Sequence, residues 1–259
     1  MAGERADARG GDTRAPGPAR RAADRGRYGR LSRARVLASA LELVDRDGLS
    51  ALSMRRLGAE LGVEAMALYR YAAGKDALLD GLVEALYLEL EERLATGAAT
   101  EETRAPGSGE EEARTPEWRA GLHRVARATY DVCLDHPQAV PLLTTRMLAV
   151  PLARRPLAVL KDHERVLALL RQAGLADERL AHAFRSFTAW LLGYVSVELR
   201  PMVDNPDESE PALRLGLHRM PPQELPVLRD IAPALAERGG PDGLAAGLDA
   251  LLDRFTRPE

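Results

Sequence analysis

The sequence predicts an all-α protein with a small N-terminal helical module and a larger C-terminal helical domain. Of its 259 residues, 46% are hydrophobic but only 4% are aromatic, and the abundant Leu and Ala favour helices. No alternating apolar and polar run persists, as a strand would require. We therefore expect a module at residues 31–78 and a domain at residues 79–259, preceded by a tail at residues 1–30.

The N-terminal tail is rich in Gly, Ala, Arg and Pro. It has too little apolar surface to fold, so we expect disorder. Several of its arginines lie just before the first expected helix. They either follow a nucleic-acid backbone, as the arms of homeodomains do, or are simply solvated. These arginines are Arg20, Arg21, Arg25, Arg27 and Arg30.

Three short helices follow, with recurring start signals. Ser32 is a suitable N-cap for a helix over residues 33–46, and Ser53 for a second helix that ends at Gly62. A third short helix begins after Glu64. Short helices are marginal alone, so we expect these three to pack together. Their expected core is Met54, Leu57, Leu61, Val63, Leu68 and Leu79.

The tight turn at Gly62 between the second and third helices is typical of a helix-turn-helix unit. The third helix has small and apolar residues at its start and tyrosines and an arginine further along. A helix with such a surface lies in the major groove of DNA in these units. DNA binding is therefore the leading hypothesis, ahead of catalysis.

The remainder of the chain also reads as helical. A longer helix at residues 75–94 carries a leucine stripe, Leu78, Leu82, Leu86 and Leu90. The polar, Gly- and Pro-containing stretch 96–116 is expected to be a flexible loop. Further helices are expected near residues 117–135, 138–149, 156–173, 177–200, 222–237 and 242–256, with a Pro-rich acidic loop at 201–221.

The charge distribution is more informative than the formal net charge of −3. Residues 1–80 carry 15 basic against 11 acidic side chains, and the remainder carries 21 against 28. Residues 31–80 alone balance at seven of each, so the tail alone accounts for the asymmetry. A neutral module binds DNA only if its positive side chains share one face.

The sequence lacks signals for secretion, membrane insertion and catalysis. Cys133 is the single cysteine, so an intrachain disulfide is impossible and a reducing compartment is expected. Residues 1–30 have no apolar signal region, and the longest nearly apolar run, 187–197, is too short to span a bilayer. The motifs HExxH, CxxC, GxSxG and phosphate-binding glycine loops are missing. We therefore expect a cytoplasmic protein that is not an enzyme and holds no metal or cofactor.

The segment from Leu31 to Leu79 resembles the DNA-binding domain of the tetracycline-repressor (TetR) family of transcriptional regulators. The resemblance lies in LSMRRLGAELGV and ALYRYAAGKDALL, with their spacing of Gly62, Leu68-Tyr69, Lys75 and Leu78-Leu79. Together with the shapes of the side chains, it identifies the expected DNA contacts. These are Arg55, Ala65, Met66, Ala67, Tyr69, Arg70, Tyr71 and Lys75.

These contacts have separate expected roles. Arg55 suits a phosphate or a guanine edge, and the start of the third helix offers apolar contacts such as those to thymine methyls. The resemblance implies that Tyr69 binds a phosphate, and Tyr71, where the family often has His, is expected to do likewise. Lys75 and the free N–H groups of its helix form a phosphate site. Packing for Tyr69 and a solvated charge for Lys75 remain alternatives.

Two further side chains qualify this interface. Arg56 is expected to be a solvated helix residue rather than a contact. Glu64 stands where the family usually has a Ser or Thr cap. It caps less well, and its charge repels a nearby phosphate, which bears on affinity rather than on fold.

Residues 118–255 resemble the ligand-binding domain of the tetracycline-repressor subgroup in WRAGLHRVARATY, LLTTR and FRSFTAWLLGYVSVEL. The resemblance implies a small-molecule pocket surrounded by helices. The family's metal-chelating His appears here as Leu142 or Leu143, so we expect a more apolar ligand than magnesium–tetracycline. The candidate pocket residues are His123, Tyr130, Cys133, Leu143, Met147, Trp190 and Tyr194, although any one of them also suits an ordinary core.

The resemblance also implies a dimer formed by two C-terminal helices, and the residues support it separately. Apolar side chains recur at helical spacing on two of the last helices. Such stripes either bury against a symmetry copy or pack within one subunit, and we favour the dimer. The expected interface is Phe184, Phe187, Leu191, Tyr194, Glu198, Leu244, Leu248, Leu251 and Phe255.

The sequence thus predicts a dimeric, ligand-responsive DNA-binding regulator. In its simplest form it is a repressor that a small, largely apolar ligand releases from a palindromic operator. One alternative is an orphan regulator without a small-molecule ligand. The other is an all-α small-molecule-binding protein or enzyme that has lost DNA binding.

Overall fold

The computed structural model describes residues 31–103, 115–204 and 223–256, together with residues 210, 216, 219 and 221. These residues form helices and turns without a strand, which confirms the predicted all-α class. The predicted disordered tail, residues 1–30, and most of the predicted acidic loop, residues 201–221, lie outside the described residues.

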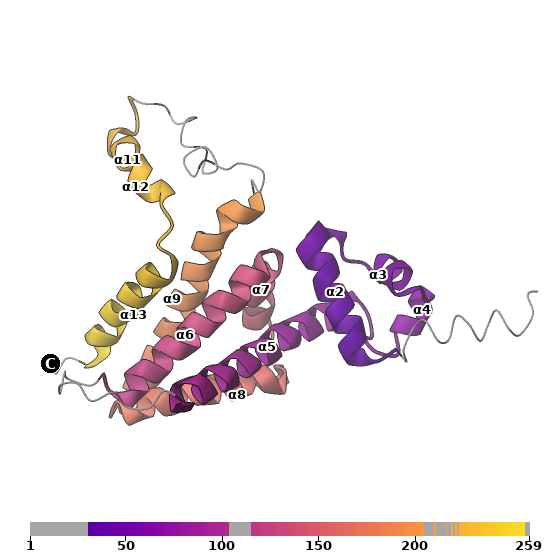
Figure 1. The fold of residues 1–259 in the computed structure, drawn as a ribbon, viewed down its shortest axis with the longest axis horizontal. Helices are drawn as coiled ribbons and strands as arrows, with labels where there is room; N and C mark the ends of the chain where they lie inside the picture. The colour runs from indigo at the N-terminus through magenta and orange to yellow at the C-terminus, as the bar shows by residue number, and fades with distance from the viewer. Residues whose placement is uncertain are drawn as a thin grey trace, which may run out of the picture.

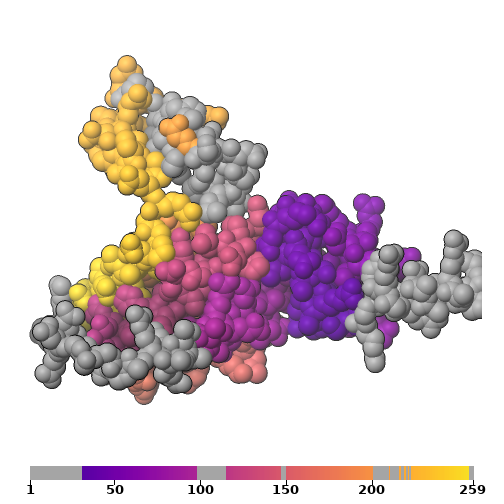
Figure 2. All heavy atoms as spheres, viewed as in Figure 1, coloured from indigo at the N-terminus to yellow at the C-terminus, as the bar shows by residue number. Residues whose placement is uncertain are grey.

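The N-terminal module consists of α2 (Arg33–Asp47), α3 (Met54–Leu61) and α4 (Ala65–Leu68), with a short 3-10 turn η1 (Leu49–Ala51) between α2 and α3. Figure 1 shows this module at one end of the molecule, and the long helix α5 (Lys75–Thr103) runs from it into the C-terminal body. In the space-filling view the module is likewise a distinct end of the molecule (Figure 2).

The body is a bundle of long helices around the far part of α5 (Figure 1). A pair of short helices, α11 (Pro226–Asp230) and α12 (Ala232–Ala236), projects away from this bundle. The bundle helices are α6 (Glu117–Asp135), α7 (Val140–Ala149), α8 (Leu157–Gln172), α9 (Asp177–Asp204) and α13 (Gly240–Thr256), with 3-10 turns η2 (Pro137–Ala139) and η3 (Leu152–Arg154).

The predicted helix starts are confirmed by their capping bonds. The Ser32 hydroxyl accepts a hydrogen bond from the Arg35 amide at 3.2 Å, and the Ser53 hydroxyl accepts one from Arg56 at 3.2 Å. Each cap satisfies an amide that has no partner inside its helix, which contributes about 1 kcal/mol. Glu64 precedes α4 without a side-chain capping bond, which agrees with the expectation that Glu caps a helix less well than Ser or Thr does.

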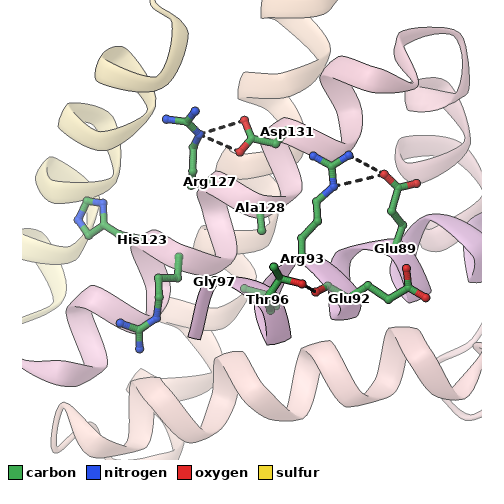
Figure 3. Close-up of a pocket in the computed structure, with 11 residues that line it drawn as sticks. Glu89, Glu92, Arg93, Thr96, Gly97, His123, Arg127, Ala128 and Asp131 are labelled. Atoms are coloured by element: carbon green, nitrogen blue, oxygen red, sulfur yellow. Dashed lines mark hydrogen bonds and ion pairs between the residues drawn. The ribbon is translucent and has the colours of Figure 1, made fainter. Parts of the chain in front are cut away.

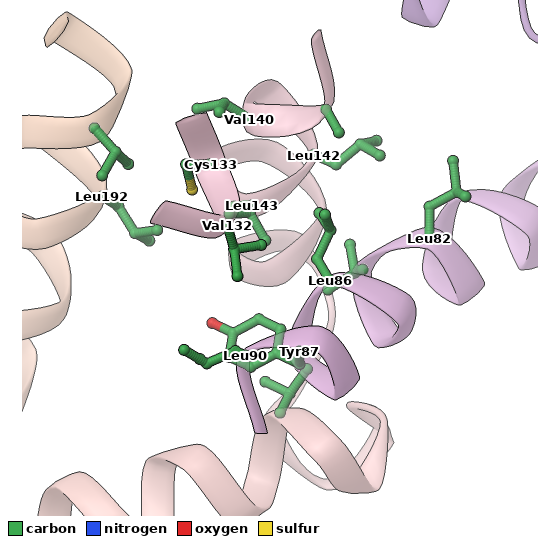
Figure 4. Close-up of a cluster of buried hydrophobic side chains, with 14 of the residues drawn as sticks. Leu82, Leu86, Tyr87, Leu90, Val132, Cys133, Val140, Leu142, Leu143 and Leu192 are labelled. Carbon is green, nitrogen blue, oxygen red and sulfur yellow. The ribbon is translucent and has the colours of Figure 1, made fainter. Parts of the chain in front are cut away.

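The predicted leucine stripe of α5 is buried along its length, at Leu78, Leu82, Leu86 and Leu90. Figure 4 shows how its far part meets the bundle, where Leu86 and Tyr87 lie beside Val132 of α6 and Leu143 of α7. Full burial of such a side chain stabilises by about 1.5–3 kcal/mol. The stripe is therefore continuous from the module into the body, so α5 belongs to both cores.

The module has the core that the sequence predicts, with one distinction. Leu57 and Leu61 of α3 and Leu68 of α4 are buried. The other three predicted members pack against this core but are only half-buried. They are Met54, Val63 and Leu79.

Three predicted boundaries differ from the structure. The helix expected over 177–200 continues to Asp204, into the expected acidic loop. The loop expected over 96–116 begins later, because α5 continues to Thr103 through residues that include several alanines and glutamates; residues 104–114 lie outside the described part. The helix expected over 222–237 is divided into α11 and α12, each with a proline in its first turn. A proline lacks the amide that would continue the preceding helix.

None of the helices in the described ranges is both long enough and apolar enough to cross a membrane.

Candidate nucleic-acid interface and cavities

The turn between α3 and α4 brings their backbones into close contact. Gly62 ends α3 in the left-handed conformation, with φ 66° and ψ 30°, and the Val63 amide donates to the Gly58 carbonyl at 2.9 Å. A Cβ at Gly58 would lie 2.9 Å from the Val63 carbonyl oxygen and 3.2 Å from the Ala65 amide nitrogen. Only glycine therefore fits at position 58, and this contact fixes the direction of α4.

The direction of α4 exposes most of the predicted base-contacting residues. Met66 is 75% exposed and Tyr69 47% exposed, and Arg70 is also exposed. Ala65 and Ala67 are half-buried. Leu68 has no exposed surface and anchors the segment in the core. The segment thus presents a mixed apolar and polar surface at the end of the molecule away from the bundle (Figure 1).

Three predicted contacts have no acidic partner within the described residues. They are Arg55, Arg70 and Lys75, and all three are exposed. The neighbouring cations are instead engaged: Arg56 pairs with Asp47 at 2.7 Å, and Arg46 pairs with Glu60 at 3.1 Å. The prediction that Arg56 is not a contact agrees with this pairing. We call the exposed surface of Arg55, Met66, Tyr69, Arg70 and Lys75 the recognition face.

Tyr71 does not belong to the recognition face. Its hydroxyl donates to the Leu31 carbonyl at 2.9 Å, and its side chain is half-buried. A tyrosine has one hydroxyl proton, so this bond uses the proton that a phosphate contact requires. The expected role of Tyr71 is corrected accordingly: it fastens the chain before α2 to the segment that follows α4.

The start of α5 lies next to an arginine that sequence reasoning missed. Arg146 of α7 donates to the Asp76 carboxylate at 2.9 Å, to the Asp76 carbonyl at 3.0 Å and to Asp80 at 2.9 Å. The charge of Asp76, beside the predicted phosphate site at Lys75, is thereby offset. Arg146 also ties α7 to the first turns of α5.

A histidine joins three elements behind the module. Nδ1 of His136 lies 2.7 Å from Asp45 of α2, and its Nε2 lies 2.9 Å from Glu89 of α5. An ionised carboxylate only accepts hydrogen bonds, so both ring nitrogens donate and the imidazolium form is favoured. The hydrogen bond to Asp45, followed by that to Glu89, raises the pKa of His136 to about 8. We call this group, with Arg33–Glu84 and Arg146–Asp80, the joint.

Most of the predicted pocket residues do not line any of the three main cavities of the described chain. Tyr130, Cys133 and Leu143 are at most 4% exposed and belong to the packed core, and burial raises the pKa of the Cys133 thiol to about 12. Trp190 and Tyr194 pack on α13, where the Tyr194 hydroxyl donates to the Gly240 carbonyl at 2.7 Å. In this structure these five side chains therefore take part in packing within the subunit, and their role as ligand contacts stays a prediction. The side chain of Met147 lies outside the described residues.

His123, by contrast, borders a groove of about 800 Å³ between α5 and α6. Figure 3 shows this groove, with Glu89 and Arg93 on one side and Arg127 and Asp131 on the other. Arg93 pairs with Glu89 at 2.6 Å, and Arg127 pairs with Asp131 at 2.9 Å. Apolar surfaces come from Leu94 and Ala128. The groove thus combines a mostly apolar lining with charged groups along its walls.

Part of the predicted dimer stripe faces into its own subunit. Phe187, Leu191, Leu244 and Leu248 are at most 5% exposed where α9 packs on α13, so packing within one subunit accounts for them. The other predicted members, Phe184, Tyr194, Glu198, Leu251 and Phe255, are half-buried.

The outer faces of the same helices carry small or apolar exposed residues that lie outside the predicted interface. They are Ala189, Gly193, Val197, Ala246 and Ala250.

In the described ranges, no group of three or more His, Cys, Asp and Glu side chains is placed to hold a metal ion.

Comparison with known proteins agrees with this arrangement. Residues 36–82 match the family described as "Bacterial regulatory proteins, tetR family", and residues 111–253 match "Tetracyclin repressor-like, C-terminal domain". Over 165 residues the chain is 33% identical to the HTH-type transcriptional repressor DrrR1 of Streptomyces coeruleorubidus. This match covers 64% of the chain, which spans about half (53%) of the length of that relative.

Solved structures share the fold over most of the chain. A possible TetR family transcriptional regulator from Streptomyces coelicolor A3(2) is similar at a TM-score of 0.66 and 27% identity, covering 87% of this chain and all of that one. The Streptomyces coelicolor protein ActR, solved in complex with actinorhodin, is similar at a TM-score of 0.62 and 24% identity, covering 88% of this chain and 97% of that one.

Proposed function

Since the chain belongs to the TetR family of bacterial regulatory proteins, we propose that it is a dimeric transcriptional repressor that releases its DNA operator when a small molecule binds. The matching families and curated relatives are transcriptional regulators, not enzymes. The proposal places the protein in the cytoplasm, where its DNA target lies.

The observation that carries the proposal is the recognition face. Its cations have no acidic partner in the described chain, so they are available to DNA phosphates and base edges. Met66 is exposed at the tip of α4, where it suits apolar contact with a thymine methyl, and a bidentate arginine suits guanine. Tyr69 and Lys75 are assigned to phosphates, which fix the position of the module on the duplex.

We assign the dimer contact to the outer faces of α9 and α13. Ala189 and Gly193 on α9 and Ala246 and Ala250 on α13 are exposed and small, so a second pair of helices can approach closely. Val197, which is 77% exposed, adds apolar area. A two-fold dimer of this kind places two recognition helices about 34–36 Å apart, in successive major grooves on one face of DNA.

We assign the effector to the groove between α5 and α6. A volume of about 800 Å³ lies within the usual range for small-molecule sites. Its mostly apolar lining suits the largely apolar ligand that the sequence suggests, and its charged walls suit a few polar groups on that ligand. The complex of the similarly folded ActR with actinorhodin supports small-molecule binding by analogy of fold alone.

The proposed release is a shift between two arrangements of the dimer. DNA favours the arrangement in which the recognition faces match successive grooves, and the effector favours another. Because α5 borders the groove and also begins beside the recognition face, a displacement of α5 changes both sites. The effector acts only to the extent that its affinity differs between the two arrangements.

Selection of bound fragments from random duplex DNA, at fixed near-physiological salt, tests the proposal. We expect an inverted repeat whose half-site centres lie about 10–10.5 base pairs apart, or a multiple of that spacing. The matched control carries Tyr69→Ala and Lys75→Ala, which should abolish enrichment without unfolding, because both side chains are exposed. A folded, dimeric wild-type sample that enriches no sequence contradicts the proposal and favours a small-molecule-binding protein that has lost DNA binding.

A further inference from the structure

A second cavity, of about 260 Å³, lies at the joint between the N-terminal module and the body. Its apolar part includes Val83 of α5 and Val159 of α8, both buried. Its charged lining comes from α2, α5, α7 and the linker before α8. These charged residues are Arg33, Asp80, Glu84, Arg146, Arg154 and Arg155.

The charges around this cavity do not balance. Four guanidinium groups and two carboxylates line the cavity, and a third carboxylate, that of Asp76, pairs with Arg146 from outside the lining at 2.9 Å, which leaves an excess of one positive charge. Arg33 pairs with Glu84 at 2.6 Å, and Arg146 pairs with Asp80 at 2.9 Å, so both carboxylates are already engaged. Clustered like charges repel one another, most strongly where the solvent is partly excluded. An anion in the cavity would offset this repulsion.

The two remaining arginines have donors to spare. Arg155 donates to the Val150 carbonyl at 3.2 Å and lies 3.0 Å from Nε2 of His163, which uses two of its five N–H groups. Arg154 is exposed, and no carboxylate of the described chain pairs with either arginine. A guanidinium fork matches the two oxygens of a carboxylate or phosphate. The adjacent pair is therefore suited to an oxyanion.

We propose that the joint cavity binds a small organic anion, with a carboxylate or phosphate head on Arg154 and Arg155 and a short apolar body against Val83 and Val159. The volume of about 260 Å³ lies below the usual range of drug-sized ligand sites, so the anion is small. This site is separate from the groove between α5 and α6, with which it shares no lining residue.

The position of the cavity connects the anion to both parts of the molecule. Arg33 belongs to α2 of the module, and Arg146 holds Asp76 next to Lys75. An anion held by Arg154 and Arg155 lies in the same cavity as the Arg33–Glu84 and Arg146–Asp80 ion pairs, so its charge changes the strength of these pairs and thereby how the module is held. Binding of the anion does not depend on the proposed function, but its regulatory effect does. By linkage, the anion and DNA alter each other's affinity by the same factor.

Calorimetric titration of the full chain with phenyl phosphate, benzoate and neutral benzamide, at constant ionic strength without phosphate or sulfate, tests the site. We expect at least one of the two anions to bind and benzamide not to bind. The better of the two anions identifies the head group. Failure of both anions at millimolar concentration overturns the proposal, and so does benzamide binding as tightly as the anions.

Variants locate the site. Arg154→Gln is expected to weaken the anion at least tenfold without unfolding the protein, because its side chain is exposed, and Arg154→Gln with Arg155→Gln to weaken it further. The matched control is Arg171→Gln at the far end of α8, where the arginine pairs with Asp177; it should bind as the wild type does. Equal binding by Arg154→Gln and the wild type overturns the assignment.

Separate measurement of DNA affinity distinguishes the two proposals. If an anion binds but no DNA sequence is selected, the result supports the anion site and contradicts the proposed repressor function. If a DNA sequence is selected but neither anion binds, the result supports the proposed repressor function and contradicts the anion site.

Discussion

The two faces of the N-terminal module carry similar charges in opposite arrangements. On the recognition face, Arg55, Arg70 and Lys75 are exposed and have no acidic partner in the described chain. At the joint, by contrast, the charges close into pairs with the body, including Asp45 with His136. Unpaired cations are free to bind another molecule, whereas paired ones hold the module in place.

This comparison explains how a module with seven acidic and seven basic residues can bind DNA. Five of its seven acids are engaged, all of them by pairs on or behind the module. The cations that remain, Arg55, Arg70 and Lys75, are exposed. We assign them to one DNA-facing surface, where the local field, and not the net charge, attracts DNA. The acids in question are Asp45, Asp47, Glu60, Asp76 and Asp80.

The largest effect is expected for a variant that displaces the recognition face and leaves the joint intact. In Gly58→Val, the added side chain meets the Val63 carbonyl and displaces α4. A displaced α4 loses its contacts to base edges, worth about 1–3 kcal/mol each, so DNA affinity should fall on the order of 100-fold. Fluorescence anisotropy with the selected duplex measures this loss. Gly97→Ala, where a Cβ meets nothing within 4 Å, is the control, and wild-type affinity in Gly58→Val would show that α4 is not positioned by this contact.

The next effect concerns the joint and its dependence on pH. The pKa of His136 is raised from 6.5 to about 8 by Asp45 and Glu89, so its contribution is full below pH 6.5 and is lost as the pH rises through 8. This shift corresponds to about 2 kcal/mol of unfolding free energy. Urea unfolding at pH 6.5 and pH 9 should show the loss in the wild type.

The same loss should be largely absent in His136→Gln, which has no titrating ring. His182→Gln serves as the control, since His182 is exposed on α9. If His136→Gln and the wild type lose stability equally between these pH values, the joint does not depend on the charged histidine.

Two tyrosines sharpen the comparison because the same substitution tests opposite faces. Tyr69→Phe should weaken DNA about fivefold, with the free energy of unfolding unchanged, because it removes one contact to a phosphate. Tyr71→Phe should lower the free energy of unfolding by about 1 kcal/mol, because it removes the bond to Leu31, and leave DNA affinity unchanged. Urea unfolding measures the stability of both variants, and fluorescence anisotropy measures their DNA affinity. Reversed results would show that Tyr71 contacts DNA and that Tyr69 stabilises the fold.

The smallest effect lies in the salt dependence. Lys75→Gln should reduce the slope of log affinity against log salt by about 0.9, the value for one phosphate contact. Lys161→Gln, an exposed lysine on α8, should leave the slope unchanged. Anisotropy titrations at four salt concentrations measure both slopes. An unchanged slope in Lys75→Gln would show that Lys75 is a solvated charge and not a phosphate contact.

Local signals in the sequence were sufficient for most of the fold. Caps such as Ser32 and Ser53 and the leucine stripe of α5 act over a few residues, so their patterns are readable without tertiary information. The start of α4 and the exposed residues on it follow from the same local rules. The later end of α5 was missed because Ala- and Glu-rich sequence suits both a helix and a polar loop.

Long-range pairing was beyond these signals. His136 and Asp45 are 91 residues apart, and Arg146 meets Asp76 from a separate helix, so no spacing rule connects them. The pocket and interface predictions had a different weakness. An apolar residue on a helix reads the same whether it fills the core or lines a cavity, as Tyr130 and Cys133 show. The more apolar stripe of α9 faces its own subunit, and the outer stripe at Ala189 and Gly193 is too small in volume to attract notice.

Oxidative footprinting with and without the selected duplex tests the central claim most directly. Hydroxyl radicals oxidise exposed methionine, and Met66 is 75% exposed in the free protein. The account predicts that saturating DNA protects Met66 and Tyr69, while oxidation of the half-buried Tyr71 does not change. Equal oxidation of Met66 with and without bound DNA would contradict the account, because DNA would then bind through another surface.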